Sequence, residues 1–147
     1  MSRLGFFALL FASSLGSLLG QNPASYQNRA ATALQFETGQ IGKDCRDAKN
    51  TLESNSCLSA VVEKTKSNFR VFYESLHSLL NPDPDAARQL ETSQAQWEKY
   101  STSACDAIDA FYRSGSIRAS AVTACHIQLT RSRMHDLDVL YNTTLHH

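Results

Sequence analysis

Four cysteines are the residues whose type and number point most directly to chemistry: Cys45, Cys57, Cys105 and Cys125. Where a chain is exported, an even number of cysteines favours disulfide bonds over free thiols. Cys105 lies ten residues before Gly115 and Cys125 ten residues after it, so a helix turning back at Gly115 would bring these two sulfurs level. Four cysteines allow three connectivities, and this symmetry favours Cys45–Cys57 together with Cys105–Cys125.

Other side chains capable of chemistry show no catalytic or metal-binding arrangement. The sequence contains no CxxC or HExxH spacing, which zinc sites commonly use. None of its serines lies in a glycine-framed motif of the kind that activates a nucleophile. We therefore expect no enzyme, no metal site and no cofactor. The histidines are His77, His126, His135, His146 and His147.

The beginning of the chain predicts export. Arg3 precedes an apolar run over residues 4–12, and small residues follow up to Gly20. This order is typical of a secretory signal peptide, and the apolar run is shorter than the about 20 residues of a membrane span. We expect residues 1–20 to be removed, leaving a secreted or periplasmic protein without a stable membrane anchor. The remaining chain has 13 basic and 14 acidic residues, and such a balance gives no electrostatic case for binding nucleic acid.

The elements that must position the cysteines are predicted to be helices. A first stripe of inward positions has alternating steps of four and three residues, typical of one helix face, and predicts a helix over residues 51–80. Asp83 and Pro84 suit the cap and first turn of a following helix, which we expect over residues 84–113. The first stripe is Leu58, Val62, Thr65, Phe69, Phe72, Leu76 and Leu79.

A third helix is predicted over residues 118–142, after the turn at Gly115. The expected fold is all-α: a small antiparallel bundle of three long helices stapled by two disulfides. Residues 21–44 are interpreted as a flexible lead-in because of their glycines, and residues 143–147 as a frayed tail. The inward positions of the second and third helices are Leu90, Gln94, Trp97, Ser101, Ala104, Ile108 and Phe111, then Val122, Cys125, Leu129, Leu137 and Leu140.

Several residues carry a resemblance to a known family. The spacing Leu90-x3-Gln94-x2-Trp97-x2-Tyr100-x4-Cys105 is followed by Gly115-Ser116 and then by Cys125-x3-Leu129-Thr130-x2-Arg133-x3-Leu137. This order resembles the lysozyme inhibitor LprI-like N-terminal domain family, and the resemblance covers about residues 45–140. It implies a small exported helical domain, here residues 45–142, in which the motif residues are mainly structural.

The chain departs from the family pattern at two places. Ser101 and Thr102 stand where the family usually has an arginine and an acidic residue, and around residues 66–73 only Tyr73 is kept. The resemblance implies a protein partner, with lysozyme as the candidate. The leading hypothesis is thus an exported, non-enzymatic protein-binding domain whose binding face is unknown. The alternatives are a structural or stress-related cell-envelope protein without an enzyme target, and a small-molecule carrier with a pocket between its helices.

Three groups of side chains have both a binding and a structural interpretation. Trp97 could be a binding anchor, but its place on the apolar stripe favours core packing. Gln94 and Arg133 are expected to form an interhelical hydrogen bond, because buried polar groups need partners. Arg70, Arg131 and Arg133 could gather carboxylates or sugar phosphates, or simply lie on a solvated helix face.

Overall fold

The computed structural model describes residues 22–147. Within this range the fold is all-α, as expected, and contains no strand. It has five helices rather than three, because a helix precedes and a short helix follows the three long ones. None of the helices in the described range is long and apolar enough to cross a membrane. The helices are α1 (Pro23–Gln40), α2 (Thr51–Leu80), α3 (Pro84–Phe111), α4 (Arg118–Leu140) and α5 (Asn142–His146).

The starts of α2 and α3 follow from their capping residues. The side chain of Asn50 accepts a hydrogen bond from the backbone N–H of Glu53 at 2.9 Å. Asp83 accepts from the backbone N–H groups of Asp85 and Ala86, with Pro84 as the first helical residue. These bonds satisfy N–H groups that the first turn of a helix leaves without a partner.

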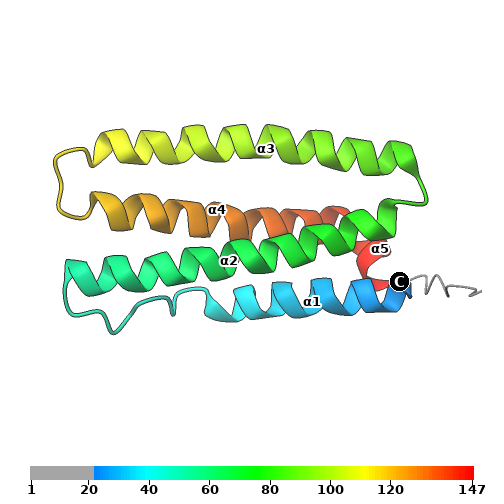
Figure 1. The fold of residues 1–147 in the computed structure, drawn as a ribbon, viewed down its shortest axis with the longest axis horizontal. Coiled ribbons are helices and arrows are strands. Elements are labelled where there is room, and N and C mark those ends of the chain that lie inside the picture. The colour runs from blue at the N-terminus through cyan, green and yellow to red at the C-terminus, as the bar shows by residue number, and fades with distance from the viewer. Residues whose placement is uncertain (1–21) are drawn as a thin grey trace, which may run out of the picture.

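The long helices lie in a row in the order α3, α4, α2, α1 (Figure 1). Helices that follow one another in the chain run antiparallel, as expected, but the neighbouring α2 and α4 run in the same direction. α1 packs along α2, and α2 packs against α4. α3 lies on the far side of α4 and makes only slight contact with α2. α5 turns back at the end of α4 and contacts α1 and α2. This arrangement leaves one side of α3 without a neighbouring helix.

The prediction of a flexible lead-in over residues 21–44 is wrong. Asn22 caps α1 by accepting from the N–H of Ala24 at 3.1 Å. Ala30 and Ala33 are buried against the core. The helix ends at Gln40, before the turn in which Gly42 has a φ of +69°. Gly39 lies within the helix and Gly42 in the turn after it, so neither glycine prevents the helix from forming.

The prediction of a frayed tail over residues 143–147 is also wrong. Leu145 of α5 is only 3% exposed and belongs to the core. The carbonyl of Thr144 accepts a hydrogen bond from Gln27 Nε2 at 3.1 Å. His146 Nε2 lies 2.7 Å from Asp138 Oδ1. One buried leucine and these two contacts dock the end of the chain against α1 and α4.

The hydrophobic core lies near the turn between α2 and α3. Phe111 and Leu140, both expected to face inward, are instead 80% and 72% exposed. Both lie at the last residue of a helix. Met134, which was not on the expected stripe, is fully buried. The buried members of the core are Ala30, Ala33, Phe72, Leu76, Leu90, Met134, Leu137 and Leu145.

Both disulfides are present in the pairing that the spacing favours. Cys45 is bonded to Cys57, and Cys105 to Cys125, with a Cα–Cα distance of 5.8 Å in each pair. The first bond ties the segment after α1 to the beginning of α2. The second joins α3 to α4 on either side of the turn that contains Gly115.

Candidate functional site

The largest concentration of motif residues lies in a groove between α2 and α3. The groove has a volume of about 450 Å³, and α4 contributes to its lining. Its aromatic wall consists of Phe69 and Tyr73 from α2 and Trp97 from α3. The ring centroids of Phe69 and Trp97 are 5.8 Å apart, and those of Phe69 and Tyr73 are 6.0 Å apart. Trp97 is half-buried, so it forms a wall of the groove rather than part of the central core.

Polar side chains form the floor of the groove. Gln94, Ser101 and Thr130 all line it and are 7%, 6% and 9% exposed. Gln94 Oε1 accepts a hydrogen bond from Arg133 Nε at 3.3 Å, and Gln94 Nε2 donates to Glu98 Oε1 at 3.1 Å. These bonds fix the orientation of the Gln94 amide. The hydrogen bond between Gln94 and Arg133 joins α3 to α4, which is the arrangement that the sequence predicts.

Arg133 lies beneath this floor as a buried cation. It is 8% exposed and also donates from a terminal nitrogen to Ser93 Oγ at 2.6 Å. It forms no ion pair with a carboxylate of the described residues. Burial lowers the pKa of Arg133 below its ordinary value, although a guanidinium remains charged at neutral pH. The pKa of Tyr73 is raised, first by burial and then by the carboxylates of Glu91 and Glu98.

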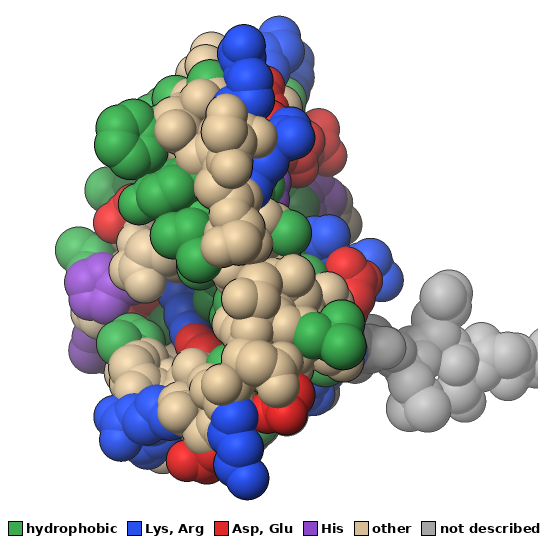
Figure 2. Space-filling model, turned by 90° about the vertical axis from the view of Figure 1, so that its left-hand side faces the viewer, with side chains coloured by type: hydrophobic (Ala, Val, Ile, Leu, Met, Phe, Trp, Pro, Cys, Tyr) green, Lys and Arg blue, Asp and Glu red, His purple; other side chains and the backbone are tan. Residues whose placement is uncertain are grey.

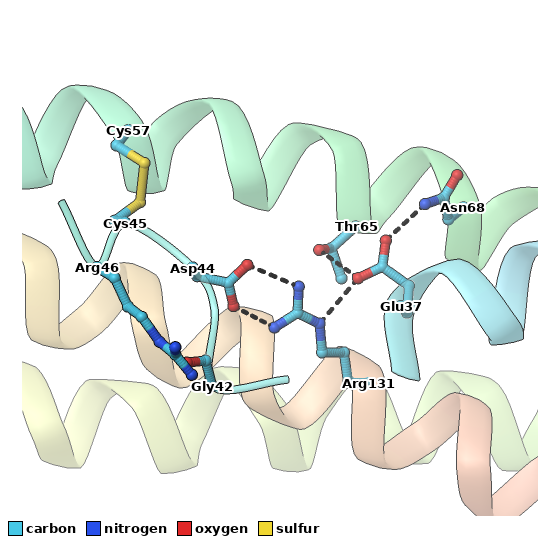
Figure 3. Close-up of polar contacts among 9 residues, drawn as sticks. All are labelled: Glu37, Gly42, Asp44, Cys45, Arg46, Cys57, Thr65, Asn68 and Arg131. Carbon is cyan, nitrogen blue, oxygen red and sulfur yellow. Dashed lines mark hydrogen bonds and ion pairs between the residues drawn. A yellow bond between two sulfur atoms is a disulfide. The ribbon is translucent and has the colours of Figure 1, made fainter. Parts of the chain in front are cut away.

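A second group of polar side chains joins α1, α2 and α4 (Figure 3). Its centre is Glu37, which is 1% exposed. The carboxylate of Glu37 accepts from Thr65 Oγ1 at 2.9 Å and from Asn68 Nδ2 at 2.5 Å, both on α2. It also accepts from Arg131 Nε of α4 at 2.8 Å. A buried carboxylate needs such partners, because leaving it unpaired costs several kcal/mol.

Arg131 extends this network to the segment after α1. Its two terminal nitrogens donate to the carboxylate of Asp44, the second at 3.1 Å. Burial by itself lowers the pKa of Arg131, but the hydrogen bonds to Asp44 and Glu37 outweigh burial and raise the pKa above its ordinary value. Arg131 therefore forms a structural ion pair that ties α4 to α1 and to the segment after it. It does not lie on a solvated helix face, which was one interpretation of the sequence.

Sequence reasoning missed Glu37 and Asp44 because it treated their segment as flexible. One signal was available: residues 30, 33 and 37 are spaced by three and four, which places Glu37 on the buried face of α1. The remaining motif residues are distributed along the bundle. Leu90 and Leu137 are in the core, Tyr100 is 61% exposed, and Gly115 lies in the α3–α4 turn, where its N–H donates to the carbonyl of Tyr112.

These features define a class of protein: a helical domain stapled by disulfides, in whose described part no group of three His, Cys, Asp or Glu side chains could hold a metal. A family model, that of lysozyme inhibitor LprI, matches residues 43–137. The chain therefore belongs to the lysozyme inhibitor LprI family, which confirms the resemblance seen in its motifs. No curated protein and no solved structure gives a significant match.

Proposed function

We propose that this protein is exported and that it acts, without catalysis, by binding and inhibiting lysozyme or a related wall-degrading enzyme. The observation that carries the proposal is the family match over residues 43–137. The predicted signal peptide and the two disulfides support a secreted or periplasmic location, because disulfides persist in oxidising compartments. The partner is accordingly a protein rather than a nucleic acid or a membrane.

The surface that we assign to this contact is the end of the bundle at the α3–α4 turn. Phe111 is 80% exposed and Ile117 is 48% exposed at the two ends of this turn. Hydrophobic side chains gather on the upper left of this end face in Figure 2. Large exposed aromatic side chains are frequent anchors of protein interfaces, whereas a scattered exposed aliphatic side chain needs no explanation.

The same end is held rigid, which favours tight binding. Cys105–Cys125 crosslinks the two helices close to the turn. Arg118 forms two hydrogen bonds of 2.6 Å to the carboxylate of Asp109 across the turn. The hydrogen bonds and charge of Arg118 lower the pKa of Asp109. A surface that is already ordered loses less conformational entropy when it binds.

The test is a lysozyme turbidity assay with the purified oxidised protein. The protein should slow the clearing of a cell-wall suspension in a saturable way and should be recovered with lysozyme in a pull-down. Phe111→Ser should weaken inhibition by about tenfold or more, the typical loss for an interface anchor.

Leu140→Ser is the matched control, because Leu140 is also highly exposed but lies at the opposite end of α4. This variant should inhibit like the unchanged protein. Absence of inhibition at micromolar excess, with no lysozyme recovered, would refute the proposal and favour a structural role in the envelope. If both variants inhibited lysozyme equally well, the proposed function would stand, but the assignment of the contact to the α3–α4 turn would be wrong.

A further inference from the structure

We propose that the groove between α2 and α3 binds a carboxylate ligand with an apolar body about the size of one aromatic ring. This site is separate from the surface assigned to lysozyme, and the proposal does not depend on lysozyme inhibition. It rests on three features of the groove: hydroxyl groups on its floor and a cation at its side that make no hydrogen bond or ion pair within the described residues, and an aromatic wall.

The hydroxyl groups on the floor of the groove have no protein partner. Ser101 and Thr130 are 6% and 9% exposed. Neither side chain makes a hydrogen bond to any group within residues 22–147, whereas the buried Thr65 and Ser75 each make one. Both residues line the groove, and their oxygens are not sealed from it, since Asn55 Oδ1 is the one fully buried side-chain oxygen or nitrogen without a partner among the described residues. The two hydroxyl groups are therefore free to bond to whatever fills the groove, and a ligand oxygen would replace water as their partner.

The charge of the lining favours an acid. Lys66 and Arg70 lie on the α2 side and Glu98 on the α3 side, which gives a formal charge of +1. Glu98 already accepts a hydrogen bond from Gln94, and Lys66 pairs with Glu63 at 3.0 Å. Arg70 has no ion pair or hydrogen bond to any group in the described range. A guanidinium binds a carboxylate through two parallel hydrogen bonds, so Arg70 is the residue that we assign to the acid.

The remaining lining suits an apolar ring. The stacked side chains of Phe69, Tyr73 and Trp97 form a continuous wall, and aromatic rings pack well against one another in offset arrangements. A volume of about 450 Å³ lies in the range of small-molecule sites, which combine an apolar lining with a few polar groups.

The direct test is a titration of the purified oxidised protein with 3-phenylpropionate, followed by tryptophan fluorescence and calorimetry. Trp97 is the only tryptophan of the chain, so its emission reports on the groove. The neutral amide 3-phenylpropanamide has the same ring and is the ligand control. We expect saturable binding of the acid and about tenfold weaker binding of the amide, the difference made by one charge-assisted hydrogen-bonded contact.

Three variants test the assigned residues. Arg70→Gln should weaken binding of the acid about tenfold and leave binding of the amide unchanged. Lys99→Gln removes the same charge from an exposed position on α3 outside the groove and should leave both affinities unchanged. Ser101→Ala should weaken binding of the acid by a few-fold, the effect of one neutral hydrogen bond.

The carboxylate could come from a free small acid or from the end of a peptide. The tripeptide Gly-Gly-Phe, with a free or an amidated C-terminus, separates these sources. Tighter binding of the free tripeptide than of 3-phenylpropionate assigns the groove to a chain terminus, and the reverse order assigns it to a small acid. No saturable binding of either acid at millimolar concentration, or equal losses in Arg70→Gln and Lys99→Gln, would overturn the proposal.

Discussion

Arg131 should be one of the most costly residues to replace in this protein. Its side chain is 6% exposed and holds the carboxylates of Glu37 and Asp44, which are 2% and 17% exposed. In Arg131→Met the methionine fills much of the same space but supplies neither charge nor donors. Glu37 would keep the hydrogen bonds from Thr65 and Asn68 (Figure 3) but would have no cation beside it.

The expected loss of unfolding free energy is about 3–5 kcal/mol, the usual cost of removing one partner from a buried ion pair. Most of this loss comes from Glu37, because Asp44 is more exposed and can regain water. Replacing both charges in Arg131→Met/Glu37→Met should recover part of the loss, since no buried charge is then left alone. Arg131→Lys keeps the charge without the planar fork and should fall between the unchanged protein and Arg131→Met.

The assay is urea unfolding of the oxidised protein, followed by circular dichroism. Arg88→Met is the control, because Arg88 pairs with Asp85 on an exposed surface where the side chains are 65% and 88% exposed. Such pairs contribute about 1 kcal/mol or less. If Arg131→Met lost no more stability than Arg88→Met, the buried network would not stabilise the fold.

Two further predictions concern the staples and the end of the chain. Replacing Cys105 and Cys125 together by serine should lower the free energy of unfolding by about 3 kcal/mol, because the crosslink spans 20 residues; urea unfolding measures the loss. Peptide mapping without reduction verifies the pairs first, and a bond from Cys57 to either later cysteine would contradict the fold. Leu145→Ala should lower the free energy of unfolding by about 2–5 kcal/mol, because the side chain is buried, and should increase hydrogen exchange in α5. A loss below about 0.5 kcal/mol would instead support a frayed tail.

The three long helices could be predicted because their signals are local. Asp83 accepts hydrogen bonds from N–H groups two and three residues after it, Pro84 suits the first turn that follows, and the alternating steps of three and four define a face without reference to other helices. The Cys105–Cys125 pair follows from the same local reasoning, since equal distances from one turn bring two positions level. Information of this kind is contained in a short window of sequence.

The buried network could not be predicted because its partners are distant in the chain. Arg131 is separated from Glu37 by 94 residues and from Asp44 by 87. Only the packing of α1 against α2 and α4 decides that these charges meet. The exposure of Phe111 has the same origin. It occupies an inward position on the stripe of α3, but this part of the helix has no second neighbour, because α3 contacts α2 only slightly.

The distribution of core and crosslinks along the bundle explains why this fold needs both disulfides. The core residues Phe72 and Leu90 flank the α2–α3 turn. Cys57 precedes Phe72 by 15 residues and Cys105 follows Leu90 by 15, which is about 22 Å along a helix at 1.5 Å per residue. The crosslinks thus lie away from the core, toward the end of the bundle that carries the α3–α4 turn, which is at the left in Figure 1.

At that left end the flat arrangement of the helices leaves few apolar side chains to bury. Burial of apolar surface is the main contribution that offsets chain entropy, so this end must be held by other means. The disulfides provide them by restricting the unfolded chain. An end that is fixed by crosslinks need not bury its side chains, and Phe111 and Ile117, which we propose as the contact surface, are exposed there. The groove lies between the two ends, where α2 and α3 are joined by neither a thick core nor a disulfide.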